Sequence, residues 1–352
     1  MPPTPSKTAA LDSSDGPRSG SSFRVAVLGG GEAGLALLKE LNRIGLASDT
    51  VLIEPSPYHY DQPAWMKVGT EGLDKKETRT EAKDRVPSGT TWIQKAATAI
   101  APENQTVTVE SGPPIHYEYL VVALGTGVHW DRIRGLKEHL GTHGICSVYG
   151  YEQSEDTWEM IRSFGGGRAL FTAPSTPHKG GIAPLTILQR AEQLWHETGI
   201  FDATELFFVT ATASAFAGET YADMIEREAQ EKNVHVYTGH DLVAVRPERH
   251  EAVFVVEKGA SQSKAVLPYD LLHVVPPMRP PALLEESGLA LESGSMRGYL
   301  DVNPESLRHN RFDSIFGIGD AIGVEGVKTG ARARQQAADS ADGLRNILRA
   351  GE

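Results

Sequence analysis

A glycine-rich turn, Gly29–Gly34, limits the possible folds of this chain more than any other feature. It follows the short apolar run Arg24–Leu28 and precedes Leu35–Ile44, in which apolar side chains recur at helical spacing. A second apolar run begins at Thr50 and ends in an acid, Glu54, twenty residues after the last glycine. Strand, turn, helix and strand in this order predict a βαβ unit that binds an adenine dinucleotide, with the acid accepting hydrogen bonds from the ribose hydroxyls.

Each glycine of the turn has its own expected role. Gly29 permits the tight turn out of the strand, Gly31 lets backbone amides approach a pyrophosphate, and Gly34 lets the helix pack closely on the sheet. Glu32 and Ala33 fall between them, where the helix N-terminus faces the anion. We therefore expect these residues to contact the cofactor.

The rest of the chain alternates strand and helix patterns. Strands are expected in the apolar and β-branched segments Thr91–Ile100, Gln105–Glu110, Tyr117–Ala123, Arg168–Thr172, Glu205–Val209, His235–Tyr237, Ala252–Glu257, Leu271–Val275 and Ser314–Ala321. Helices are expected over residues 154–164, 184–198 and 329–348. Alternating patterns of this kind are typical of parallel sheets covered by helices.

These patterns predict an α/β protein with two Rossmann-like domains, each built on a doubly wound parallel sheet. The dinucleotide-binding domain is expected to be discontinuous, comprising residues 23–150 and 282–352. Residues 151–281 are expected to form the second domain, with the proline-rich segment 276–281 as the return crossing. Residues 1–22, rich in Pro, Ser, Thr and Gly without a targeting pattern, are expected to be a disordered tail.

Composition excludes several classes of partner. A net charge of -12 disfavours binding to nucleic acid and to anionic membranes, and no apolar run has the roughly 18 residues needed to span a bilayer. The single cysteine, Cys146, rules out an intrachain disulfide, and no pair of His or acidic residues has metal-binding spacing. We expect a cytoplasmic protein without a metal site, and its oligomeric state stays open, a homo-oligomer included.

Several later motifs resemble those of one flavoprotein family. The strand Leu120–Val122 runs into a turn containing Gly125, Thr126 and Gly127, which resembles the Ala-Thr-Gly turn of flavoproteins with two dinucleotide-binding domains. Further similar stretches are Tyr58–Trp65, Ala169–Pro177, Leu272–Met278, Phe316–Asp320 and Lys328-Thr329. Together they resemble the sulfide:quinone oxidoreductase family, which is related to flavocytochrome c sulfide dehydrogenase flavoproteins and type II NADH dehydrogenases.

This resemblance implies FAD as the cofactor. It assigns Gly125, Thr126 and Gly127 to the cofactor site and Asp320 to the ribityl chain. Lys328 and Thr329 would start the last helix, where amides and the helix dipole stabilise negative charge on the reduced flavin. The second domain lacks a Gly-x-Gly-x-x-Gly turn, so we expect no nicotinamide site there.

The chain departs from the family at its reactive cysteines. Where the family's Thr-Pro-x-Lys turn is followed by cysteine, this sequence has Gly180, and the cysteine of the family's C-terminal extension has no counterpart before Glu352. Sulfide oxidation through a disulfide needs two sulfur atoms from the protein, and a lone Cys146 cannot supply both. His178 and Lys179, in the same turn, are candidates for proton transfer or for orienting a substrate, and Lys328 is a third candidate.

These observations predict an FAD-dependent oxidoreductase that lacks the cysteine relay. A small reduced substrate would pass electrons through flavin N5 to a quinone or to oxygen. Two alternatives remain open at this point. One is a flavin-binding scaffold or redox sensor without catalysis, and the other is a biosynthetic flavoenzyme that acts on an organic substrate.

Overall fold

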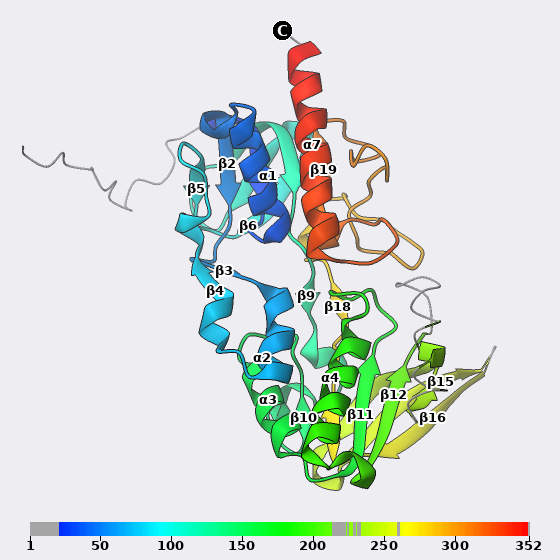
Figure 1. Ribbon diagram of the computed structural model, residues 1–352. Coiled ribbons are helices and arrows are strands. Elements are labelled where there is room, and N and C mark those ends of the chain that lie inside the picture. The colour runs from blue at the N-terminus through cyan, green and yellow to red at the C-terminus, as the bar shows by residue number, and fades with distance from the viewer. Residues whose placement is uncertain are drawn as a thin grey trace, which may run out of the picture.

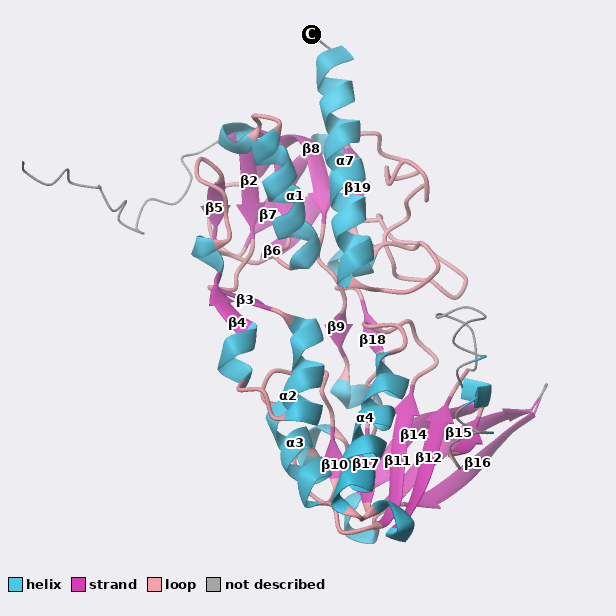
Figure 2. Cartoon of the chain, viewed as in Figure 1, coloured by secondary structure: helices cyan, strands magenta, loops and turns pink. Residues whose placement is uncertain are grey.

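The computed structural model describes residues 21–212, 223, 225–227, 230, 234–258 and 261–350. They form two α/β units, one above the other in Figure 1, connected by two short strands. In Figure 2 both units show a sheet accompanied by helices. The tail expected over residues 1–22 lies outside the described residues except for its last two, and Ser22 already begins the first strand.

The upper unit is built on a seven-stranded sheet. Its strands are β1 (Ser22–Leu28), β2 (Thr50–Ile53), β5 (Thr91–Ile93), β6 (Ala97–Ala101), β7 (Thr106–Val109), β8 (Ile115–Val122) and β19 (Ile315–Gly317). Strands β5, β2, β1, β8 and β19 run parallel, whereas β7 and β6 extend the sheet in antiparallel fashion. Because β19 pairs with β8, with Ile315 opposite Leu120, the C-terminal part of the chain completes the first sheet.

Two helices, α1 (Glu32–Arg43) and α7 (Gly330–Ala350), pack side by side in the upper unit (Figure 1). The buried side of α1 carries leucines at helical spacing, including Leu35, Leu38 and Leu41. Helix α7 contributes mostly alanine to the same core. Small side chains allow the two helices to approach closely, which brings their N-terminal ends toward the same side of the sheet.

The lower unit contains a five-stranded parallel sheet in the order β10-β17-β11-β12-β13. These strands are β10 (Ile145–Cys146), β11 (Gly167–Ala173), β12 (Thr204–Thr210), β13 (His235–Tyr237) and β17 (Leu271–His273). Helices α3 (Gln153–Ser163) and α4 (Ala183–Thr198) belong to the same unit. Helix α2 (Trp65–Glu71) comes from the first part of the sequence but packs against α3. It follows the antiparallel strand β3 (Tyr58–Tyr60), whose partner is β4 (Arg79–Glu81).

A three-stranded antiparallel sheet adjoins the lower unit. It consists of β14 (His240–Arg246), β15 (Glu251–Lys258) and β16 (Ser261–Pro268). The sequence predicts β15 only. Buried residues of this sheet, such as Phe254, pack with Leu170 and Leu272 of the parallel sheet. The lower unit therefore has a second layer that a simple doubly wound domain lacks.

Strands β9 (Gly127–Val128) and β18 (Met278–Arg279) carry the chain from the upper unit to the lower one and back. These strands pair with each other, so the outward and the return crossings lie side by side. The short helix α6 (Leu283–Glu286) follows the return. The expected change of domain at residue 150 lies after β10, yet β10 already pairs with β17 of the lower sheet, so the change occurs earlier in the chain. The two parallel sheets confirm the predicted α/β class with two Rossmann-like units.

Candidate functional site

A cavity of about 980 Å³ is lined by residues of both units. Of the residues predicted to bind the cofactor, all but Gly34 and Gly127 line this cavity. The ones that line it are Gly29, Gly31, Glu32, Ala33, Glu54, Gly125, Thr126, Asp320, Lys328 and Thr329. From the lower unit, Val148, Tyr149, Lys179, Gly180 and Ala183 face the same space. A cavity of this size is at the upper end of the range for small-molecule and cofactor sites, roughly 300 to 1,000 Å³.

The glycine-rich turn has the close approaches that its sequence predicts. A Cβ on Gly34 would lie 1.9 Å from the carbonyl oxygen of Gly29, and a Cβ on Gly29 would lie 2.5 Å from that of Ala123. Gly34 does not line the cavity, because it packs beneath the turn. Gly31 differs from both, since a Cβ there would meet no atom within 4 Å and would enter the cavity side of the turn. The turn therefore holds open space where a pyrophosphate is expected.

Glu54 lies at the end of β2 and is fixed by backbone amides. Its Oε2 accepts a hydrogen bond of 2.7 Å from Gly30 N, and its Oε1 accepts one of 2.7 Å from Ser56 N. Each carboxylate oxygen can accept a further hydrogen bond, because an ionised carboxylate has about four lone-pair positions. Glu54 is thus held in place beside the turn and retains acceptor capacity toward the cavity.

An ion-pair group that the sequence did not reveal surrounds Glu32 at the start of α1. Arg334 Nη1 donates a hydrogen bond of 2.6 Å to Glu32 Oε1, and His59 Nε2 lies 3.8 Å from Glu32 Oε2. Burial, aided by the charge of Arg85, lowers the pKa of His59. All four side chains line the cavity, so this part of it carries the guanidinium groups of Arg85 and Arg334 as well as carboxylates.

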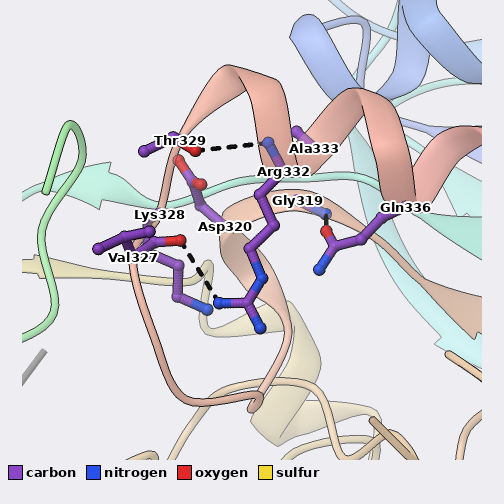
Figure 3. Close-up of a pocket in the computed structure, with 8 residues that line it drawn as sticks. All are labelled: Gly319, Asp320, Val327, Lys328, Thr329, Arg332, Ala333 and Gln336. Carbon is purple, nitrogen blue, oxygen red and sulfur yellow. Dashed lines mark hydrogen bonds between the residues drawn. The ribbon is translucent and has the colours of Figure 1, made fainter. Parts of the chain in front are cut away.

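Beside this group, the turn before α7 brings together Asp320, Lys328 and Thr329 (Figure 3). Lys328 Nζ donates to the carbonyl oxygens of Ile322 and Val324, at 2.8 and 3.3 Å. Burial lowers the pKa of Lys328 to about 8, although the charge of Asp320 opposes this shift. Burial likewise raises the pKa of Asp320, against the influence of Lys179 and Lys328.

Helix α7 itself holds this turn in place (Figure 3). Thr329 Oγ1 accepts from Arg332 N at 3.4 Å, an N-cap arrangement, and Arg332 Nη1 donates to the carbonyl oxygen of Glu325 at 2.9 Å. Gln336 Oε1 accepts from Gly319 N at 2.8 Å and so links the helix to the Gly-Asp turn. The side chains of Lys328 and Arg332 together fix the loop from which the helix starts.

Lys179 reaches across the cavity from the lower unit. Its Nζ donates to Gln62 Oε1 at 2.8 Å, and its backbone amide donates to the Met278 sulfur at 3.4 Å. Burial lowers its pKa, and the charge of Asp320 acts in the opposite direction. The next residue, Gly180, donates from its amide to the carbonyl oxygen of Lys328 at 2.8 Å and has φ +86°. This turn therefore joins the lower unit to the start of α7.

The neighbouring candidate His178 does not line the cavity. It is buried, with Nε2 3.2 Å from the carbonyl oxygen of Gly181 and Nδ1 3.5 Å from that of Thr176. Burial lowers its pKa. Gly127 likewise lies outside the cavity lining, in β9.

Cys146 is buried in the core of the lower unit and does not line the cavity. Burial raises the pKa of its thiol to about 12. Because the thiolate is the reactive form of cysteine, this side chain is unreactive at neutral pH. The position next to Lys179, where the resemblance expects a cysteine, is a glycine that lines the cavity.

The part of the chain that the structure describes contains no group of three or more His, Cys, Asp or Glu side chains arranged to hold a metal ion. Its helices include none with the length and apolar character required to cross a bilayer.

Comparisons with known proteins agree with this geometry. Residues 23–167 match the family model for pyridine nucleotide-disulphide oxidoreductases. The mitochondrial sulfide:quinone oxidoreductase of Dictyostelium discoideum is 36% identical over 89% of this chain and 68% of its own length, and that of Mus musculus is 34% identical over 89% and 69%. The chain belongs to the sulfide:quinone oxidoreductase-like family of pyridine nucleotide-disulphide oxidoreductases.

A solved structure of this family, the sulfide:quinone oxidoreductase of Aquifex aeolicus, superposes with a TM-score of 0.76. The alignment covers 94% of this chain and 77% of that one at 20% identity, which is evidence for the fold alone. As a member of the sulfide:quinone oxidoreductase-like family, this chain is a flavin-dependent oxidoreductase, as the sequence predicts.

Sequence reasoning missed several residues of the cavity: Ser56, His59, Gln62, Arg85 and Arg334. Gln62 and His59 stand inside a stretch that carries the family resemblance, and this was the available signal. Nothing in the sequence around Arg334 distinguishes it from the other arginines of α7, because its role depends on the packing of α7 against α1.

Proposed function

We propose that this protein binds FAD in the 980 Å³ cavity and oxidises a small reduced substrate without a cysteine relay, with a quinone or oxygen as the final acceptor. One observation carries the proposal: the cavity joins the glycine-rich turn, the Gly-Asp turn and the start of α7 with Gly180, whereas the only thiol is buried elsewhere.

The residues present suit FAD. The open space at Gly31 and the N-terminus of α1 favour the pyrophosphate, and Glu54 has acceptor capacity for ribose hydroxyls. Asp320 and the capped N-terminus of α7 line the neighbouring part of the cavity, which suits the ribityl chain and the flavin ring. When bound, FAD supplies an acceptor for two electrons at N5.

Basic side chains of the protein would stabilise negative charge or transfer a proton in this part of the cavity. Lys328 is fixed to two carbonyl oxygens, so it contributes a stationary positive charge and is poorly placed to move a proton. Lys179 has more freedom and a lowered pKa, which suits either proton transfer or substrate binding. His178 is engaged by its own turn, so the geometry favours a supporting role for it.

A spectroscopic experiment tests the proposal. Purified protein is expected to carry flavin absorbance at one FAD per chain. After anaerobic photoreduction, mixing with air or with a soluble quinone is expected to restore the oxidised spectrum rapidly. Protein without flavin would overturn the proposal. Slow reoxidation by every acceptor would instead support the scaffold or redox-sensor alternative.

A further inference from the structure

The cavity is larger than the parts assigned to FAD, and its remaining end has a distinct composition. Tyr60 of β3 and Trp65 and Met66 of α2 line it on one side, and Val148 and Lys179 of the lower unit line it as well. This region, which we call the Lys179 end, therefore has apolar walls with Lys179 at its edge, and Asp61 and Gln62 also line the cavity between Tyr60 and Trp65. The inference that follows rests on the proposed function, because it assigns the rest of the cavity to FAD.

Lys179 has unused hydrogen-bonding capacity. An ammonium has three N–H donors. Among the described residues the only hydrogen bond of Lys179 Nζ is to Gln62 Oε1, which is a neutral acceptor, and no carboxylate lies within ion-pair distance. A half-buried ammonium with a neutral partner is poorly compensated, since burial removes part of its hydration.

The charges nearby do not neutralise the Lys179 ammonium. Asp320 is close enough to influence both Lys179 and Lys328, so three buried or half-buried groups carry one more positive than negative charge when all are ionised. Lys328 satisfies its ammonium with backbone carbonyl oxygens. The remaining positive charge is therefore available at Lys179.

The backbone holds Lys179 firmly in its position. Tyr149 Oη donates to the carbonyl oxygen of Lys179 at 3.3 Å, and the Lys179 amide donates to the Met278 sulfur. Gly180, the next residue, donates to Lys328. Three contacts from separate segments fix the backbone of this turn, and the bond from Nζ to Gln62 directs the ammonium into the cavity.

The apolar wall opposite is also rigid. The rings of Tyr60, Trp65 and Tyr151 pack edge to face, with centroid separations of 5.1 to 6.5 Å. Aromatic rings in such a cluster give a flat ligand a large contact area at little entropic cost. Gly180, opposite, presents no side chain to obstruct it.

From these observations we propose that the Lys179 end binds the substrate as an organic anion with a flat apolar body, whose anionic group pairs with Lys179 while its body lies against Tyr60 and Trp65. Benzoate is a suitable probe, and benzamide is its neutral counterpart of the same shape. Only benzoate carries a negative charge that can pair with the Lys179 ammonium.

The test is a calorimetric titration of the FAD-loaded protein, with FAD content measured before and after. We expect benzoate to bind roughly tenfold or more tightly than benzamide, and Lys179→Met to weaken benzoate binding to the level of benzamide. Lys179→Arg, which retains the charge, should restore part of the affinity. Lys67→Met, an exposed lysine beside Met66 that does not line the cavity, is the matched control and should bind benzoate normally.

Three results would overturn the inference: equal binding of benzoate and benzamide, unchanged benzoate binding in Lys179→Met, or release of FAD by benzoate. The last would place the anion at the pyrophosphate end instead. Protein that holds no FAD would contradict the proposed function, so the FAD measurement separates the two failures.

Discussion

Arg334 Nη1 lies 2.6 Å from Glu32 Oε1, and this contact joins the first turn of α1 to the first turn of α7 across 302 residues of sequence. Both side chains line the cavity beside the glycine-rich turn. A carboxylate at this point would repel the pyrophosphate, and the guanidinium reduces that repulsion.

Arg334→Met should therefore weaken FAD binding. The pair is partly exposed, so we expect a modest effect. On dilution, FAD release should be roughly three- to tenfold faster or more complete, as measured by flavin fluorescence. Arg349→Met, at the exposed far end of the same helix, is the control. Identical FAD release from both variants would show that FAD binding does not require Arg334 to compensate the charge of Glu32.

Gly31→Val and Gly34→Ala should fail for different reasons. The Gly31 side chain would enter open space at an ordinary φ of -74°, so the fold should survive while FAD is lost. In Gly34→Ala the added carbon collides with Gly29, which should lower the free energy of unfolding by about 1 to 3 kcal/mol. Thermal melting and flavin content measure the two effects separately. A Gly31→Val protein with stoichiometric FAD would mean that the pyrophosphate lies elsewhere.

Replacing Gly180 with cysteine should not restore sulfide oxidation. At φ +86° a side chain is strained, and the Cβ would lie 2.9 Å from that of Ala183, so the substitution should cost about 1 to 2 kcal/mol of stability. A second thiol is also absent from the cavity lining, because Cys146 is buried in the core. Gly180→Ala is the control, because it has the same backbone strain but no thiol. Rapid flavin bleaching by sulfide in Gly180→Cys alone would refute this expectation.

Cys146 should be chemically silent in the native protein. Since burial raises its thiol pKa to about 12, thiol reagents at pH 8 should label it only after denaturation. Cys146→Ser should leave the rate of flavin reduction and reoxidation nearly unchanged. Rapid labelling of the folded protein, or loss of turnover in the serine variant, would revive a thiol mechanism.

Lys328 should make stability depend on alkaline pH. Its pKa falls from 10.5 in the unfolded chain to about 8 in the folded protein, so the unfolded state binds more protons between these values. The cost of burying the charge is present below pH 8 and disappears as the pH rises toward 10.5. Relative to Lys328→Met, the unfolding free energy of the native protein should rise by about 2 to 3 kcal/mol from pH 7 to pH 10. Parallel urea-unfolding curves of the two proteins at all pH values would contradict this.

Local patterns were sufficient to predict much of the fold. Strand β13 has the predicted bounds, and β11, α3 and α4 differ from prediction by a residue or so, because their apolar spacing is regular. Strand β16 escaped prediction since its first half, Ser261–Lys264, is polar and has no alternation. Its position depends on pairing with β15, which no local signal reports.

Part of the cavity lining could be predicted from the sequence. Gly31 and Glu54 follow from their spacing in a βαβ unit and Asp320 from the family resemblance; all three line the cavity, and their contacts with FAD stay predictions. The sequence could not show which of His178 and Lys179 faces the cavity. The His178 side chain turns toward its own loop, whereas the Lys179 side chain turns toward Gln62. Side-chain direction in an irregular turn is set by tertiary contacts.

The pairing of β19 with β8 has a consequence for how the protein is made. During synthesis the first sheet emerges early, but Ile315–Gly317 and helix α7 leave the ribosome only after the whole lower unit. Until then Leu120–Val122 of β8 lack their partner strand on one side, and the cavity lacks Asp320 and Thr329. The lining of the cavity is therefore complete only after Asp320 and Thr329 have been synthesised, when the lower unit is already able to fold.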